Sequence, residues 1–210
     1  SWRMEQMARH YLRVIEAVID DRARQLRHID LLSDEERRGI LEEWNGPQRE
    51  IPPATLPQLF EEQVRRSPGA VAVVYEDREI TYRELNERAN RLAHLLISRG
   101  IGPEEIVALF LPRSVELIVA LMGILKAGAS YLPIDPDYPL ERVSLMLDDA
   151  QPSCLIASGQ TSWSLPASDT PNQQRWLLDR PEMLHALQLC PDTDPDNCRR
   201  PVPLGAPHPP

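Results

Sequence analysis

The chain has 210 residues, of which 42% are apolar and 5% aromatic, and its formal net charge is -9. This length suits one domain plus pieces of others, and the apolar content is sufficient for a hydrophobic core. The acidic balance, the lack of a basic block and the scarcity of aromatic residues argue against nucleic acid and anionic membranes as partners. Because no apolar run has the length of a membrane span and the first residues lack a signal-peptide core, we expect a cytoplasmic protein.

The first twenty residues predict one amphipathic helix. Its apolar side chains recur every three or four positions: Met4, Met7, Ala8, Tyr11, Leu12, Ile15, Val18 and Ile19. Two heptads are too few for a stable coiled coil, so we expect this helix to dock onto a larger body.

A short second helix and a break follow. Ser33 and Glu36 form a capping-box pattern that opens the stretch "DEERRGILEEW". The stretch "NGPQREIPP" then combines an Asn45–Gly46 turn with three prolines, which indicates a linker.

From about Thr55 onwards, strands are expected to alternate with helices. Thr81 and Glu84 form a second capping-box pattern, at the start of a helix. The expected order is a helix in "TLPQLFEEQVRRSPG", a strand at 70–76, a helix at 82–99, a strand at 106–112, a helix at 115–127 capped by Ser114, a strand in "SYLPI", a helix in "LERVSLMLDDA" and a strand in "SCLIAS". This alternation predicts an α/β fold with β-α-β units, a partial parallel sheet and right-handed crossovers, preceded by a helical segment.

The helix at 115–127 is apolar around almost its whole circumference, which predicts burial on most sides. The expected elements are too few to cover it, so we expect further protein to do so.

After residue 158 the pattern weakens: "SGQTSWSLPASDTPNQQ" is typical of a loop, and "RWLLDRPEMLHALQL" leaves room for a strand and a short helix. The last twenty residues contain seven prolines and predict an extended linker.

The stretch "LKAGASYLPIDPDYP" contains the main candidates for catalytic or metal-binding residues. We interpret Lys126 as a solvated lysine in the last turn of a helix and Gly128 as a C-cap with positive φ. Asp135 and Asp137 could bind a metal, but aspartates beside prolines more often form a turn with nearby backbone. The stretch is therefore interpreted as the junction between a helix and the next strand.

Other candidate ligands are interpreted as structural residues. Pro133 is expected near the end of a strand and Tyr131 in the core. The cysteines, Cys154, Cys190 and Cys198, are odd in number and irregularly spaced, which favours idle thiols over a metal site. The five histidines are scattered and form no ligand face.

Two long segments carry a family resemblance. "EITYRELNERANRLAHLLISRGI" and "LMGILKAGASYLPIDPDYPLERVSLMLDDAQPSCLIAS" closely resemble the first two signature regions of adenylation domains of nonribosomal peptide synthetases. The resemblance implies four segments: the last helix of a condensation domain at 1–23, a condensation–adenylation linker at 24–54, the N-terminal part of the adenylation domain at 55–157, and a poorly patterned, proline-rich segment at 158–210. Its implied fold is the incomplete N-terminal subdomain of an adenylate-forming enzyme.

The resemblance also implies an activity for the parent protein. Such enzymes join a carboxylic acid to ATP as an acyl-adenylate, release pyrophosphate and pass the acyl group to a thiol, here the phosphopantetheine arm of a carrier domain. The wording "LPIDPDYP" favours the branch that activates amino acids. ATP, magnesium, a carrier domain, a condensation domain and the rest of the adenylation domain are the implied cofactors and partners.

No catalytic, cofactor-binding or metal-binding residue is assigned in this sequence. A phosphate loop needs clustered backbone donors, whereas "SGQTS" has one glycine and no lysine. In the family, the phosphate loop, the amino-acid pocket and the catalytic lysine come later in the chain. We therefore expect a catalytically incomplete fragment, with two alternatives: a non-catalytic scaffold that docks to synthetase domains, or part of an enzyme like the acyl-CoA ligases.

Overall fold

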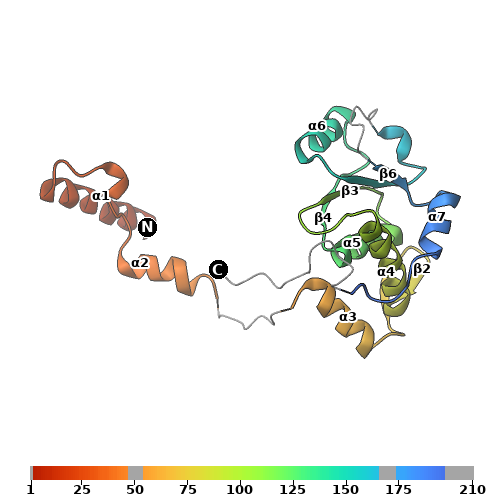
Figure 1. Cartoon of the computed structure of the whole chain (residues 1–210). Helices are drawn as coiled ribbons and strands as arrows, with labels where there is room; N and C mark the ends of the chain where they lie inside the picture. Colours follow the sequence, from red (N-terminus) through yellow and green to blue (C-terminus); the bar gives the residue numbers. More distant parts are fainter. Residues whose placement is uncertain (1, 47–53, 166–173, 197–210) are drawn as a thin grey trace. The chain divides into compact units, whose positions relative to one another are not determined.

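The computed structural model describes residues 2–46, 54–165 and 174–196 (Figure 1). The chain divides into two compact units, Ser1–Pro52 and Pro53–Pro210. Three features of the sequence lie outside the described residues: the linker prolines at 47, 52 and 53, most of the predicted proline-rich tail, and Cys198. Within the described ranges, no helix is long and apolar enough to cross a membrane.

The first unit contains α1 (Trp2–Asp20), the 3-10 helix η1 (Leu26–His28) and α2 (Asp34–Arg38), which continues into a π-helical turn, η2 (Gly39–Glu43). The predicted capping box is confirmed, because the Ser33 side chain accepts a hydrogen bond from the Glu36 amide and the Glu36 side chain accepts one from the Ser33 amide. Gly46 has a φ of +71°, as the Asn45–Gly46 turn requires.

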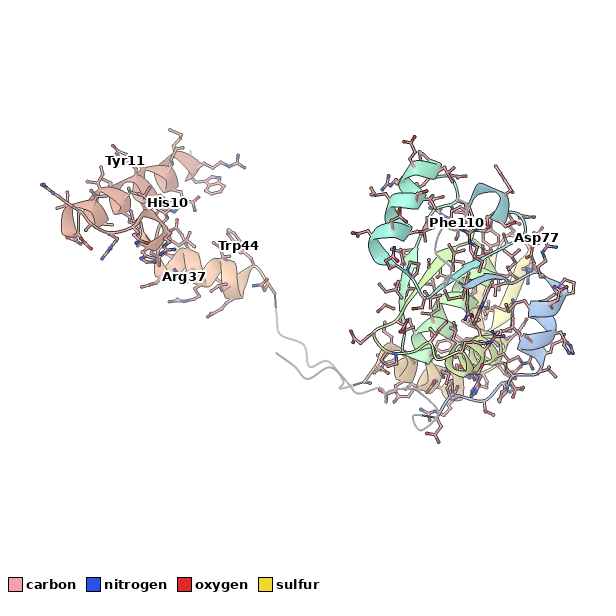
Figure 2. All side chains as sticks on the ribbon, turned by 45° about the horizontal axis from the view of Figure 1, so that its top comes forward. His10, Tyr11, Arg37, Trp44, Asp77 and Phe110 are labelled. Carbon is pink, nitrogen blue, oxygen red and sulfur yellow. The ribbon has the colours of Figure 1, made fainter. Side chains whose placement is uncertain are left out.

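The polar side of α1 is the side that contacts α2. Gln6 and His10 both bond the Glu36 carboxylate, at 3.0 and 3.1 Å, and the Arg13 guanidinium donates to the Leu32 carbonyl at 2.5 Å. The predicted apolar stripe is therefore exposed: Tyr11 is 67% exposed and lies on the side of α1 away from α2 (Figure 2).

The second unit is built on a parallel sheet with the strand order β4-β3-β5-β6. The strands are β3 (Ile106–Phe110), β4 (Ser130–Pro133), β5 (Cys154–Ala157) and β6 (Gln174–Leu177). All of β5 and most of β3 are buried, as expected of central strands covered on both faces. The predicted parallel sheet is confirmed.

Helices cover both faces of this sheet (Figure 1). On one face, α4 (Tyr82–Ser98), α5 (Val115–Ala127) and α7 (Pro181–Gln188) pack against Val107 and Leu109 of β3. On the other face, α6 (Leu140–Ala150) packs against Ala108 and Phe110. The alternation along β3 therefore divides the core into two layers.

A smaller layer packs against α4 and α5. It consists of α3 (Leu56–Arg66) and an antiparallel hairpin of β1 (Val71–Tyr75) and β2 (Arg78–Thr81). Buried residues of β2, α4 and α5 form its core with Phe60 of α3 packed against them. At the second predicted capping box, the Thr81 hydroxyl accepts from the Glu84 amide at 3.2 Å.

The burial predicted for the helix at 115–127 is confirmed. Every residue of α5 is buried or half-buried, and α4 crosses it closely at Gly123. A Cβ at Gly123 would lie 2.9 Å from Leu92 Cδ2 and 3.1 Å from the Ala89 carbonyl oxygen. Ser114 caps the helix as predicted, by accepting from the Leu117 amide at 3.2 Å.

The stretch after α5 forms the predicted junction, with one exception. Gly128 has a φ of +91°, the Asp135 carboxylate accepts from the Asp137 amide at 3.0 Å, and Pro133 is the last residue of β4. Tyr131 was expected in the core but is 44% exposed. The reason is its place on β4, the edge strand, which pairs only with β3 in the described sheet.

The sheet continues past residue 157. β6 pairs with β5, and α7 follows, so the strand and short helix predicted within residues 175–189 both form. Of the preceding stretch expected to be a loop, residues 158–174, the part at 166–173 lies outside the described residues, and the described part contains a single 3-10 turn, η3 (Ser162–Ser164).

Candidate functional site

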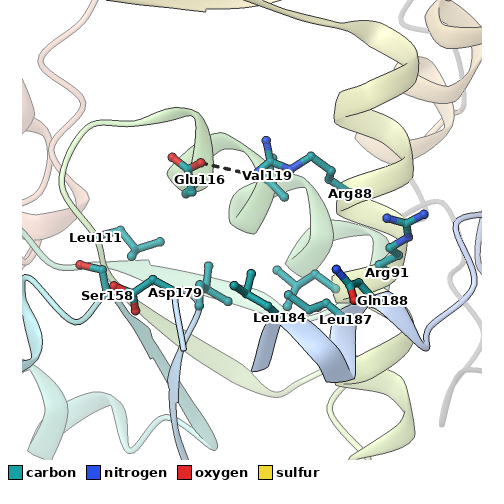
Figure 3. A pocket seen from close by; sticks show the side chains of 12 residues that line it. Arg88, Arg91, Leu111, Glu116, Val119, Ser158, Asp179, Leu184, Leu187 and Gln188 are labelled. Carbon is teal, nitrogen blue, oxygen red and sulfur yellow. Dashed lines mark hydrogen bonds and ion pairs between the residues drawn. The ribbon is translucent and has the colours of Figure 1, made fainter. Parts of the chain in front are cut away.

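A cavity of about 530 Å³ lies beside the carboxyl ends of β3, β5 and β6 (Figure 3). Its walls come from α4, α5 and α7 and from the residues that follow the strands: Arg88, Arg91, Leu92, Leu111, Glu116, Val119, Ser158, Leu178, Asp179, Leu184, Leu187 and Gln188. In open parallel sheets, ligands bind outside the carboxyl ends of strands where the strand order reverses. Here that point lies between β3 and β5, so this cavity is the candidate site.

Most of the cavity wall is apolar, and ion pairs line its mouth. The Glu116 carboxylate, in the first turn of α5, contacts the guanidinium groups of Arg78 at 3.1 Å and Arg88 at 3.3 Å. Burial raises the pKa of Glu116, but its backbone N–H and the two arginines outweigh burial, so the net pKa lies below the ordinary value. The carboxylate is therefore ionised at neutral pH.

The loops at the carboxyl edge are tied to one another. The Gly159 amide, after β5, donates to both carboxylate oxygens of Asp179, after β6, at 2.8 Å each. The buried Thr161 hydroxyl donates to the Phe110 carbonyl at 2.9 Å, which connects the same loop to β3. The stretch "SGQTS" is therefore a structural connection between three strands.

The described residues at this edge do not fit a triphosphate. A phosphate site needs several backbone donors or cations aimed at the ligand. Here both cations and one backbone donor already have partners. Arg88 pairs with Glu116, Arg91 pairs with Asp192 at 3.3 Å, and the Gly159 amide donates to the Asp179 carboxylate. No group of three His, Cys, Asp or Glu side chains in residues 2–46, 54–165 and 174–196 is placed to hold a metal ion.

A second cavity, of about 470 Å³, lies at the ends of β3 and β4. Its wall includes Arg113 and the residues from Pro133 to Tyr138, so the stretch "PIDPDY" lines it. The Asp135 carboxylate is used within its own turn, and the Arg142 guanidinium lies 4.1 Å from the centre of the Tyr138 ring. The turn interpretation is therefore confirmed for Asp135, whose carboxylate accepts from the Asp137 amide.

Lys126 was expected to be solvated, and that prediction is wrong. Its side chain is fully buried, and its Nζ lies 2.5 Å from Glu61 Oε1 and 2.9 Å from Asp194 Oδ1. The cause is non-local: α3 and the segment after α7 both cover this side of the last turn of α5. The sequence does contain one unused signal, because Lys126 belongs to a helix that is apolar around almost its whole circumference and was predicted to be buried on most sides.

The two described cysteines behave as predicted, as thiols without a disulfide. Burial raises the pKa of Cys154 to about 12 and also raises that of Cys190. The Cys154 thiol is therefore protonated at neutral pH.

Comparisons with known proteins identify the family. Residues 60–205 match the family model of the AMP-binding enzymes. A dimodular nonribosomal peptide synthase of Bacillus subtilis (strain 168) is 44% identical over 198 residues, which is 94% of this chain and 8% of that protein. Tyrocidine synthase 3 of Brevibacillus parabrevis is 48% identical over 147 residues, which is 70% of this chain and 2% of that protein.

Solved structures agree with the sequence comparisons. The N-terminal subdomain of Klebsiella oxytoca NpsA matches with a TM-score of 0.57 and 28% identity, over 70% of this chain and 35% of that chain. The nonribosomal peptide synthetase FmoA3 shares the fold, with a TM-score of 0.71 and 24% identity, over 97% of this chain and 21% of that chain. The chain thus spans a small part of the relatives that it matches. It belongs to the AMP-binding enzyme family and is the N-terminal part of a nonribosomal peptide synthetase adenylation domain.

Proposed function

We propose that the parent protein activates an amino acid with ATP as an aminoacyl-adenylate and then loads it onto the phosphopantetheine thiol of a carrier domain. The observation that carries this proposal is the 44% identity to a dimodular nonribosomal peptide synthase over 94% of the chain. A Klebsiella oxytoca structure in which an adenylation domain is artificially fused to a PCP domain also matches, with a TM-score of 0.58 and 28% identity.

The role of this chain in that reaction is to build one wall of the domain. The parallel sheet packs against α4 and α5, and the cavity at its carboxyl edge faces the ends of β3, β5 and β6. Because the described residues there do not fit a triphosphate, the groups that bind ATP and magnesium come from elsewhere in the parent domain. The chain by itself is then catalytically incomplete.

ATP–pyrophosphate exchange tests this proposal. We expect the parent synthetase to exchange label in the presence of one amino acid and magnesium, and the 210-residue chain alone to give no exchange above background. Magnesium-dependent exchange by the isolated chain would contradict the assignment of its role. A parent that exchanges with fatty acids in place of amino acids would favour the acyl-CoA-ligase-like alternative.

The exposed stripe on α1 supports a further part of the proposal. We assign residues 1–23 to the end of a condensation domain and residues 24–54 to the linker before the adenylation domain. Tyr11 is 67% exposed and Met7 61%, although both are apolar side chains on one face of a regular helix. Such a face requires an apolar partner, and the condensation domain of the same synthetase would supply it.

A scaffold is the second candidate function. Its support is the paired state of Arg88 and Arg91, which leaves the described cavity without a built anion site. A parent that binds its neighbouring domains but supports no exchange with any amino acid would favour this candidate.

A further inference from the structure

The segment that follows α7 is bound along α4 by an array of side chains. Residues 191–196, which we call the latch, have the sequence Pro-Asp-Thr-Asp-Pro-Asp. The Asn90 amide donates to the Asp192 carbonyl at 2.6 Å, and His94 Nε2 donates to the Thr193 carbonyl at 2.9 Å. Because a carbonyl only accepts, His94 carries its hydrogen on Nε2 in this arrangement.

Asp194 is the centre of the latch. Its Oδ1 accepts from Asn86 at 2.9 Å, from Asn90 at 3.0 Å and from Lys126 Nζ at 2.9 Å. Burial raises the pKa of Asp194, but the bonds from Lys126 and the two asparagines outweigh it, and the net pKa lies below the ordinary value. The carboxylate is therefore held as an anion.

The pairing between Lys126 and Asp194 is asymmetric. The Lys126 side chain is 0% exposed, whereas that of Asp194 is 45% exposed. The buried ammonium has no access to water while the latch is in place, whereas the half-exposed Asp194 can leave by movement of the latch alone. Glu61 and the Phe60 ring, 5.8 Å from Nζ at its centroid, would still surround the ammonium after that movement.

The latch is connected directly to the cavity at the carboxyl edge. It begins two residues after Leu189, the C-cap of α7, and α7 supplies Leu184, Leu187 and Gln188 to the cavity wall. Asp192 of the latch also pairs with Arg91, which lines the same cavity. The latch and this wall are therefore continuous in the chain, and both contact α4.

We propose that Lys126 is the positioning residue of this latch: its buried ammonium holds Asp194 against α4 and α5, and so fixes α7 as a movable wall of the cavity. This role goes beyond the proposed function and does not depend on it, because it concerns contacts within the 210-residue chain. Release of Asp194 lets α7 move away from α4 and opens the cavity, while the sheet stays folded.

Amine acylation provides a direct test, because Lys126 is the only lysine. The probe is the N-hydroxysuccinimide ester of acetic acid, and the readout is the mass of the peptide that contains residue 126. In the folded chain we expect this peptide to react far more slowly than in the urea-unfolded chain. Asp194→Ala should speed the reaction about tenfold or more, since it frees the side of Lys126 that the latch covers.

Hydrogen exchange provides the second readout. In Asp194→Ala, amides of α7 and of residues 190–196 should exchange about tenfold or more faster, while those of β3 and β5 keep their protection. Glu182→Ala is the matched control, because it removes an exposed carboxylate from the first turn of α7 and should change neither readout. A merely structural role for the ion pair would speed exchange in the sheet as well.

The outcomes are distinct. Unchanged acylation and exchange in Asp194→Ala, or an equal loss of protection in α7 and β5, would overturn the proposal. If Asp194→Ala does not fold, Asp194→Asn keeps the Oδ1 acceptor and removes the charge, and it should give a smaller gain in both readouts. Rapid acylation of Lys126 in the unaltered folded chain would also overturn it.

Discussion

At the scale of single residues, the closest approach between α4 and α5 depends on Gly123. Gly123→Ala should destabilise the second unit by about 1–3 kcal/mol, the usual cost of an added methyl group in a packed core. The added Cβ meets Leu92 Cβ at 3.0 Å and the Ala89 carbonyl oxygen at 3.1 Å, and the backbone atom cannot turn away as a side-chain end can. Urea unfolding followed by circular dichroism measures the change.

Gly69→Ala is the control for this prediction. An added Cβ at Gly69 meets no atom within 4 Å, so its effect should stay within about 0.5 kcal/mol. Equal effects at the two glycines would show that the contact with Leu92 and Ala89 does not limit the packing of α5.

Local chemistry could be predicted from the sequence, and burial by distant segments could not. The positive φ of Gly128 and the turn at Asp135 depend on a few neighbouring residues, and both were predicted correctly. The burial of Lys126 depends on Glu61 and Asp194, which lie 65 and 68 residues away in the chain. The helical periodicity around residue 126 does not indicate which distant segments cover the Lys126 side chain.

At the scale of elements, the start of α2 carries the clearest pH dependence. The pKa of Glu36 is lowered to about 2, first by the Ser33 backbone N–H and then, against the effect of burial, by the Ser33 hydroxyl, Gln6 and His10. A carboxyl group whose pKa falls on folding stabilises the folded state above its ordinary pKa of 4.5. This stabilisation is lost as the pH falls from about 4.5 towards about 2.

An NMR titration of the Glu36 side chain, together with helicity at each pH, tests this expectation. The contact between α1 and α2 should weaken only in the acidic range, in parallel with protonation of Glu36. Glu36→Gln should remove that part of the pH dependence, because the amide does not titrate. A Glu36 midpoint near 4.5 would contradict the prediction.

The helix caps yield a second prediction at this scale. Ser114→Ala should cost about 1 kcal/mol, because the Leu117 amide at the start of α5 loses its acceptor. Ser98→Ala is a suitable comparison: the Ser98 hydroxyl donates only to the Leu95 carbonyl in the last turn of α4, and we expect a smaller loss. Thermal unfolding of both variants measures the difference.

The elements themselves were largely predictable. The helices at 115–127 and 140–150 have the predicted bounds, because Ser114 and Gly128 mark the ends of the first and apolar periodicity marks the second. The position of β6 was harder to predict from the sequence. It has only four residues and follows a stretch typical of a loop, so it shows little periodicity. It becomes a strand because β5 offers a free edge.

At the scale of the whole molecule, the exposed stripe of α1 should promote self-association. Tyr11→Glu should reduce it, since a carboxylate within the stripe opposes burial of the stripe in a contact between copies. Arg9→Gln changes the net charge by the same amount away from the stripe and serves as the control. Light scattering after gel filtration, over a range of concentrations, measures the average mass.

A monomer at all concentrations before any substitution would contradict this expectation. Equal effects of Tyr11→Glu and Arg9→Gln would assign self-association to net charge instead of the apolar stripe.

The family could be identified from sequence because its two signatures cover α4 and the run from α5 to β5. The cavity could not, because its walls combine α4 and α5 with α7, which lies outside both signatures.

The strand order β4-β3-β5-β6 also determines the order in which the strands can pair during translation. β3 leaves the ribosome before both of its neighbours, since it gains β4 only after α5 has emerged, and β5 only after α6. Until then its apolar side chains and its backbone groups remain open to other nascent chains. A pause in translation between β3 and β5 should therefore increase the demand of this protein for chaperones.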